Sequence, residues 1–170
     1  MSGPVTFDQC DSALTCTAGE IAKISSGNTW NNPSSARSNY GFNSGEGIAI
    51  RFKCPTTSAY RMIGFARSTY PTSGTYSNGY TQLTHSIYCI HGGGIQVYES
   101  GASRSTGQTY STTDTMEVRL FPDGTVDYTK NGNVIYTSGV TVSQWPLYAA
   151  VSIYTQTNPS ISEIQYAAVP

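Results

Sequence analysis

Charged residues are scarce in this chain. Only 11% of its 170 residues are Asp, Glu, Lys or Arg, and 9 basic residues stand against 10 acidic ones. Nucleic-acid-binding domains carry a basic excess that releases counterions from the phosphate backbone, so we expect no nucleic-acid partner. Disorder requires low hydrophobicity with high net charge, and a net charge of −1 with 38% apolar residues argues against it.

Long apolar runs and targeting segments are also missing. No run approaches the ~18 consecutive apolar residues that span a bilayer, so we expect no membrane insertion. No basic segment followed by an apolar one opens the sequence, so a signal peptide is not evident. Such a leader can be removed during maturation, and an extracellular location therefore stays open.

Motifs for catalysis and metal binding are absent as well. The chain contains no G-x-S-x-G nucleophile motif and no Cys-x-x-Cys pair. His85, Cys89 and His91 share one parity of a strand, but only Cys89 and His91 are near neighbours there. Ordinary hydrogen bonding is the expected role of these histidines. We therefore expect a protein that is not an enzyme and needs no metal or other cofactor.

The four cysteines are Cys10, Cys16, Cys54 and Cys89, and they permit two disulfides. Cys10 and Cys16 would close a small loop, and Cys54 would bridge Cys89. Four cysteines allow three pairings, and the sequence does not choose among them. Four buried free thiols are the alternative.

Small polar residues and tyrosine take the place of charge. The chain has 22 Ser and 22 Thr beside 17 Gly and 13 Tyr. Helix formers are scarce, whereas β-branched and aromatic residues favour strands and glycine favours turns. The composition therefore predicts an all-β protein.

The clearest strand pattern lies in residues 115–138. Apolar residues alternate with others from Met116 to Leu120, and Asn131-Gly132 is the strongest hairpin signal, because a type I′ turn needs positive φ twice. Similar segments occur at 47–52, 61–67, 86–91, 94–99, 146–154 and 161–168. About eleven or twelve short strands predict one domain over residues 1–170, an antiparallel two-sheet sandwich, with a closed barrel as the alternative.

Two irregular segments, 28–43 and 67–84, are the longest between the predicted strands. Carbohydrate binding needs aromatic faces that stack on a sugar ring and polar groups that bond to its hydroxyls. The candidate carbohydrate-binding residues are Trp30, Asn31, Asn32, Tyr40, Arg67, Tyr70, Tyr76, Asn78 and Tyr80, with Asn39 as a further polar partner. The alternative for each ring is packing in or on the sandwich.

Tyrosines within the predicted strands form a second candidate surface. They are Tyr88, Tyr98, Tyr128, Tyr136, Tyr148 and Tyr154. Strand alternation turns some of them away from the core. An exposed row of tyrosines on a sheet would bind sugar or protein, whereas cover by a second layer or a dimer partner is the alternative.

The order of these segments resembles concanavalin A-like jelly rolls, which include legume-type lectins, laminin-G-like domains and SPRY domains. DGTVDYTKNGNVIY (123–136) is similar to their hallmark hairpin, PLYAAVS (146–152) to the strand after it, and RMIGFA (61–66) to the strand before their variable loop. IAKI (21–24) followed by GNTWN (27–31) resembles the opening of small hemagglutinin-type lectins of slime moulds. The resemblance covers about residues 20–168 and implies a jelly-roll fold.

The lectin members imply a non-catalytic carbohydrate-binding protein at the cell surface or outside the cell, with glycans or glycoproteins as partners. The scattered acidic residues match neither the metal cluster of legume lectins nor the E-x-D-x-x-E strand of related glucanases. Weak binding at single sites would favour a homo-oligomer. The SPRY members imply an alternative, an intracellular protein- or peptide-binding module with reduced thiols. A viral receptor-binding domain is a third possibility.

Overall fold

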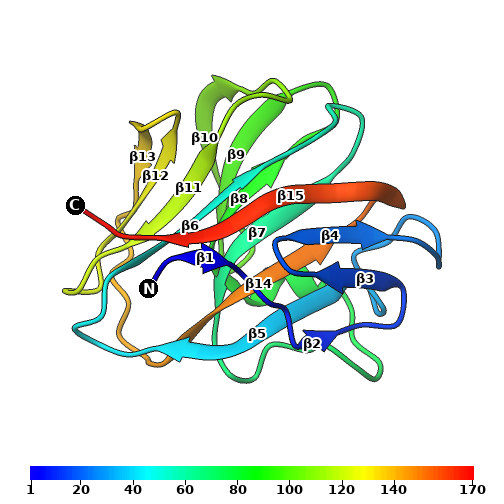
Figure 1. The fold of residues 1–170 in the computed structure, drawn as a ribbon, viewed down its shortest axis with the longest axis horizontal. Helices are drawn as coiled ribbons and strands as arrows, with labels where there is room; N and C mark the ends of the chain where they lie inside the picture. Colours follow the sequence, from blue (N-terminus) through cyan, green and yellow to red (C-terminus); the bar gives the residue numbers. More distant parts are fainter.

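Two antiparallel β-sheets packed face to face form the protein, and the computed structural model describes all 170 residues (Figure 1). The eight-stranded sheet has the order β13 (Asn133–Thr137), β12 (Val126–Lys130), β11 (Met116–Leu120), β6 (Ile48–Lys53), β15 (Thr157–Ala167), β4 (Glu20–Lys23) and β3 (Leu14–Thr17), and β1 (Gly3–Pro4) also pairs with β15. The seven-stranded sheet has the order β10 (Ala102–Thr109), β9 (Gly94–Glu99), β8 (Leu83–Cys89), β7 (Arg61–Ala66), β14 (Leu147–Ile153), β5 (Ser35–Phe42) and β2 (Gln9–Cys10). The predicted all-β, two-sheet jelly-roll sandwich is confirmed.

Alternation along the strands builds the core between the two sheets. Ile50 of β6 and Val118 of β11 are paired and point inward, and Ile87 and Val151 of the facing sheet point toward them. All four side chains are fully buried. Burying a side chain of this size stabilises the fold by about 1.5–3 kcal/mol. The outward residues of the same strands are therefore free to differ between the sheets.

Residues 115–138 form the predicted meander of β11, β12 and β13. Asn131 and Gly132 have φ values of 51° and 83°, the two positive values that the predicted turn needs. The predicted hairpin connection at 91–94 joins β8 to β9. Both hairpins follow from local turn chemistry.

Strand β5 is the main departure from the sequence pattern. Residues 28–43 are predicted as a loop, but Ser35–Phe42 form a strand between β14 and β2. Its sequence, SARSNYGF, has no apolar alternation, because residues 35–38 are buried on both faces of the strand while Asn39 and Tyr40 are exposed. Ala36 packs in the core, and the Arg37 guanidinium lies 4.0 Å from the centre of the Tyr148 ring on the outer side. Its neighbours, not its own pattern, hold this strand in the sheet.

The cysteines divide into two pairs. Cys10 and Cys16 form a disulfide with their Cα atoms 6.3 Å apart, one of the pairings the sequence allows. Cys54 and Cys89 are buried free thiols with their sulfur atoms in contact at 2.6 Å. Cys54 follows β6 and Cys89 ends β8, so this second pair lies between the two sheets.

A second layer covers part of the outer side of the seven-stranded sheet. It consists of the segment 27–34 and the segment 67–82, which ends in the 3-10 helix η1 (Gly79–Gln82). A small hydrophobic cluster lies beneath it, made of Met62, Ala66, Tyr70, Leu83 and Ala150. This covering layer positions the site described next.

No helix in the structure has the length and apolarity to cross a membrane.

Candidate functional site

Six aromatic rings form a continuous surface on the outer side of the seven-stranded sheet. They are Trp30, Tyr60, Tyr80, Tyr88, Tyr98 and Tyr154, and we call this surface the aromatic face. All six residues are half-buried. Two come from the covering layer, and the other four lie in strands of the sheet or directly beside them.

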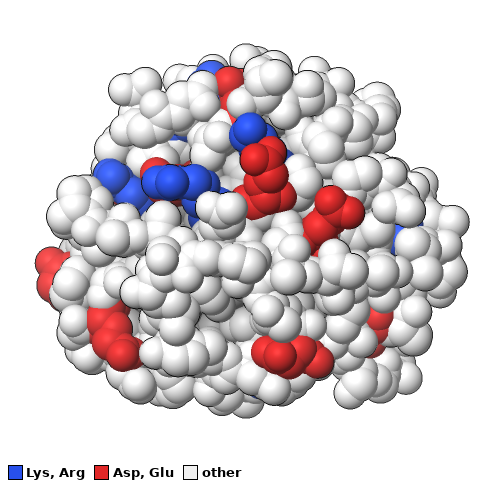
Figure 2. Space-filling view, in the orientation of Figure 1, with Lys and Arg blue, Asp and Glu red and all other residues white.

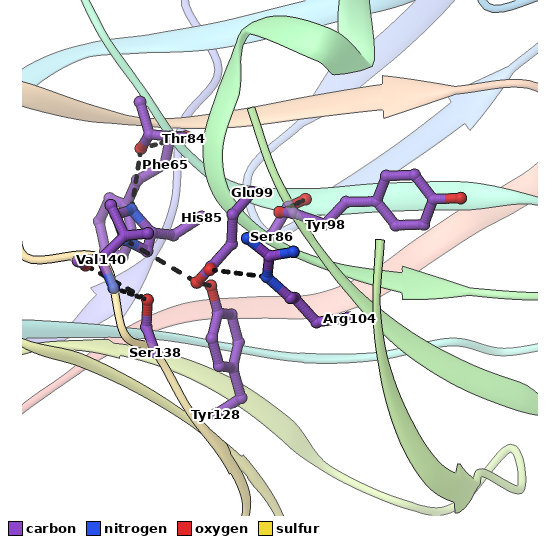
Figure 3. Close-up of polar contacts among 10 residues, drawn as sticks. All are labelled: Phe65, Thr84, His85, Ser86, Tyr98, Glu99, Arg104, Tyr128, Ser138 and Val140. Atoms are coloured by element: carbon purple, nitrogen blue, oxygen red, sulfur yellow. Dashed lines mark hydrogen bonds and ion pairs between the residues drawn. The ribbon is translucent and has the colours of Figure 1, made fainter. Parts of the chain in front are cut away.

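Strand alternation turns the sheet tyrosines outward. Tyr88 lies between the core residues Ile87 and Cys89, so its ring points to the opposite side. Successive residues of β9, Tyr98 and Glu99, likewise point to opposite sides of the sheet (Figure 3). The outward row predicted from the strand tyrosines is therefore present at positions 88, 98 and 154, whereas Tyr128 is buried in the core.

The rings are arranged as two rows of three. The first row is Tyr60, Tyr88 and Tyr98, and the second, in the same order, is Tyr154, Trp30 and Tyr80. The three pairs across the rows each have ring centres 5.8 Å apart, with 89°, 72° and 82° between their planes. Edge-to-face pairs of this kind are favourable beyond their burial alone.

The first two pairs enclose a shallow hollow with an empty volume of about 470 Å³, lined only by the rings of Trp30, Tyr60, Tyr88 and Tyr154. The planes of Tyr60 and Tyr88 differ by 36°, and those of Trp30 and Tyr154 by 45°. Each row supplies two rings to one wall of this hollow, and we use the name trough for it. No charged or amide side chain lines it.

A fully buried lysine connects elements beneath the trough. The Lys23 ammonium donates to the carbonyls of Thr29 at 3.0 Å, Ile153 at 3.2 Å and Tyr154 at 3.1 Å, and to the Ser34 hydroxyl at 2.9 Å. Burial lowers the pKa of Lys23 to about 8. These bonds tie the residue before Trp30 to the end of β14, so Lys23 sets the spacing of one wall.

The asparagines predicted to bind sugar instead join the two covering segments. Asn31 Oδ1 accepts from the Asn78 backbone N–H at 2.9 Å, and Asn32 Oδ1 accepts from the Tyr76 backbone N–H at 3.1 Å. The amide oxygens of Asn31 and Asn32 therefore already have partners. These two hydrogen bonds fix the position of the segment that carries Trp30.

Tyr76 links the covering layer to the N-terminal region of the chain. Its hydroxyl donates to the Asp11 carboxylate and accepts from the Ser34 backbone N–H at 2.9 Å. Burial raises the pKa of Asp11, and burial together with the bond to Asp11 raises the pKa of Tyr76 to about 12. Tyr76 thus supports the aromatic face without belonging to it.

The remaining predicted residues lie elsewhere. Tyr70 is 4% exposed and its hydroxyl donates to the Val151 carbonyl at 2.8 Å, so it packs beneath the layer. Tyr40 is exposed and packs on Phe42 at 5.0 Å, near the N-terminus. Tyr60 precedes the first residue of β7 and Arg67 follows its last residue, so the two residues lie about 20 Å apart along the strand. Of the nine predicted residues, the structure brings Trp30 and Tyr80 together on the aromatic face.

Arg67 lines two adjoining hollows at that other end of the sheet. Their empty volumes are about 360 and 440 Å³, and both are also lined by Thr84 and Ser100. His85 forms part of the floor of the first hollow. Hydroxyl and amide side chains dominate their linings, in contrast to the trough.

A buried polar cluster lies next to these hollows, between the sheets (Figure 3). Glu99 accepts from the Tyr128 hydroxyl at 2.8 Å, and its carboxylate is 3.9 Å from both His85 Nε2 and Arg104 Nε. His85 Nε2 is also 2.9 Å from the Val140 carbonyl oxygen, and burial lowers the pKa of this histidine. The cluster joins β9 of one sheet to β12 of the other. No group of three or more His, Cys, Asp or Glu residues is placed to hold a metal ion.

No protein-family model and no curated protein matches the sequence. Solved structures do match the fold. The TRIM65 PSpry domain has a TM-score of 0.65 at 11% identity, covering 98% of this chain and 90% of that chain. The SPRY domain of human HERC1 has a TM-score of 0.60 at 17% identity, covering 94% of each chain. Stonustoxin has a TM-score of 0.63 at 12% identity, covering 97% of this chain and 28% of the toxin chain. The fold is thus the jelly-roll sandwich of SPRY domains.

Proposed function

We propose that this chain is a non-catalytic recognition module that binds a protein partner through the aromatic face. The observation that carries the proposal is the face itself, six half-buried rings on a sheet with no charged residue among them. Tyr and Trp dominate the energetics of protein interfaces because they bury large areas while losing few rotatable bonds. The SPRY-fold neighbours support this protein-binding alternative over the lectin interpretation.

The absence of catalysis is part of the proposal. Glu99 and His85 are the nearest approach to an acid–base pair, and their side chains are only 3% and 2% exposed. His85 Nε2 already contacts the Val140 carbonyl, so a substrate would have to displace the segment that contains Val140 to reach the imidazole. The cluster is better suited to joining the two sheets than to proton transfer.

Carbohydrate binding is the second candidate function, and the observation that favours it is Trp30 in the wall of the trough. The faces of Trp and Tyr rings stack on the apolar side of a sugar. The asparagines that would orient the hydroxyls are engaged between the covering segments, which weakens this alternative. A lectin with this single shallow site would need a homo-oligomer for tight binding to cells.

An extracellular or cell-surface location is proposed on the basis of the Cys10–Cys16 disulfide. Disulfides persist in oxidising compartments and are rare in the cytosol. Protein isolated from its native source without reductant should resist alkylation at Cys10 and Cys16, as measured by peptide mass spectrometry. Full alkylation of both residues would indicate a reducing compartment.

Selection from a phage-displayed library of random peptides, with a glycan array in parallel, tests the proposed function. We expect the wild type to select peptides whose affinity falls at least about tenfold in Tyr154→Ala, because the substitution removes a ring of the trough. Tyr40→Ala is the matched control, since Tyr40 is an exposed tyrosine off the aromatic face. Array hits that depend on Tyr154, without peptide hits, would replace the proposal by the carbohydrate alternative. Hits that ignore Tyr154 would place the site elsewhere.

A further inference from the structure

The trough offers a ligand ring faces and a few hydroxyl and N–H groups. Its side chains bring three phenol hydroxyls and one indole N–H. Tyr60 and Tyr154 make their hydrogen bonds within the protein through backbone atoms alone, so their hydroxyls are available to a ligand. A ligand that fits must therefore present apolar surface together with hydrogen-bond acceptors.

Several ligand chemistries fit the trough poorly. A charged side chain would find no counter-ion, because no acidic or basic residue lines the hollow. An extended peptide could not add to the sheet as a new strand, because β7, β8 and β14 each have a neighbour on both sides. The backbone N–H groups of an ordinary peptide would compete for the few acceptors that the hydroxyls provide.

Proline removes this last difficulty. It has a carbonyl acceptor but no backbone N–H, so a proline-rich segment leaves no donor unsatisfied against the trough. Its carbonyls accept from phenol hydroxyls, and its ring packs against aromatic faces. Such segments already adopt the polyproline II helix before binding, so little conformational entropy is lost.

The ring spacing along one wall of the trough matches the rise of this helix. Polyproline II rises about 3.1 Å per residue, hence about 6.2 Å for two residues. The ring centres of Tyr60 and Tyr88 are 6.2 Å apart, equal to this rise, whereas those of Trp30 and Tyr154 on the other wall are closer, at 5.3 Å. From this match and the donor pattern we propose that the aromatic face binds a proline-rich segment in the polyproline II conformation. The inference rests on the proposed function and specifies the chemistry of the partner.

The direct test uses a blocked oligoproline peptide of about nine residues, three turns of the helix. The same peptide built from D-proline is the control, because it has identical composition and a mirror-image helix. Binding is followed by fluorescence in a Trp145→Phe background, in which Trp30 is the one remaining tryptophan. We expect saturable binding of the L-peptide and at least tenfold weaker binding of the D-peptide.

Variants then place the peptide in the trough. Tyr154→Ala should weaken binding at least about tenfold, and Tyr88→Phe, which keeps the ring and removes one donor, severalfold. Tyr40→Ala should leave binding unchanged, and far-UV circular dichroism checks that each variant is folded. Equal binding of the two enantiomers, or none, would overturn the proline proposal. If library peptides without proline then still depend on Tyr154, the proposed function stands; if they do not, both proposals fail.

Discussion

The outer faces of the two sheets carry different kinds of side chain. On the eight-stranded sheet, outward residues of β6, β11 and β12 form ion pairs across neighbouring strands, Arg51 with Glu117 at 2.9 Å and Arg119 with Asp127 at 2.6 Å. Figure 2 views the molecule from the side of β15 and shows charged side chains distributed among uncharged ones. On β8 and β9 of the seven-stranded sheet, the outward residues are uncharged and carry hydroxyls, an amide and rings: Thr84, Ser86, Tyr88, Gln96 and Tyr98.

This difference shows that the alternating pattern requires apolar side chains only at the inward-facing positions of each strand. Inward residues must be apolar to build the core, whereas outward residues need only be compatible with water or with a covering layer. Paired charged side chains are compatible with water, so the outer face of the eight-stranded sheet needs no covering layer or partner. Six contiguous aromatic rings instead present apolar surface to water, and contiguous apolar patches on a protein surface mark interaction sites. The contrast itself therefore points to the aromatic face.

Alkaline pH should produce the largest effect, because phenols are buried both beneath the covering layer, as Tyr70 is, and in the core between the sheets, as Tyr110 is. Burial raises the pKa of Tyr70, and raises those of Tyr76 and Tyr110 to about 12. Because the unfolded value is about 10, stability is intact below pH 10 and falls as the pH rises toward 12, by roughly 2–3 kcal/mol for each such phenol. Arginine–carboxylate pairs keep their charges over this range.

Tyrosine ionisation followed by ultraviolet absorbance, with circular dichroism in parallel, checks this prediction. We expect a fraction of the 13 tyrosines to ionise only as the protein unfolds between pH 10 and 12. Complete ionisation near pH 10 in a folded protein would contradict the buried placement of these phenols.

Lys23→Met should have the next largest effect, about 3 kcal/mol or more of destabilisation. The substitution leaves the buried Ile153 carbonyl, the buried Ser34 hydroxyl and two partly buried carbonyls without their charged donor. Lys53→Met is the matched control on the other face, where the exposed pair with Glu163 contributes about 1 kcal/mol at most. Urea unfolding measures both, and similar losses in the two variants would show that the lysine does not anchor the layer.

Much of the fold could be predicted because inward alternation and turn chemistry are local. Residues 115–138 carry both signals and form the expected meander. Strand β5 could not be predicted, since its pairing depends on β14 and β2, which are distant in the sequence. Small and polar residues fill both faces of its buried first half, so the sequence of this strand shows no period-2 pattern of apolar residues.

The site could be predicted only in part for a related reason. Trp30 and Tyr80 stand out as aromatics in irregular segments, and the outward strand tyrosines follow from parity. Tyr60 precedes its strand and carries no such signal. Asn31 bonds to a residue 47 positions away, so its structural role depends on a contact that no local pattern reveals.

Tyr76→Phe should have an intermediate effect, about 1–3 kcal/mol, because it removes a donor from the buried Asp11 and an acceptor from the Ser34 N–H. Tyr136→Phe on β13 is the control, with a half-buried ring on the other sheet. We expect the first variant also to weaken ligand binding, since the segment that carries Trp30 is released. Thermal unfolding and peptide titration measure the two effects separately.

Arg119→Met should have the smallest effect and completes the comparison of the two faces. Its guanidinium makes two bonds to Asp127, at 2.6 and 2.7 Å, but both side chains remain partly exposed. Pairs of this kind contribute about 0–1 kcal/mol, and the loss should shrink further in high salt. Ligand binding by the aromatic face should not change, because the pair lies on β11 and β12 of the opposite sheet. A loss of stability larger than that of Lys23→Met would mean that the charged face, not the aromatic one, carries the greater structural constraint.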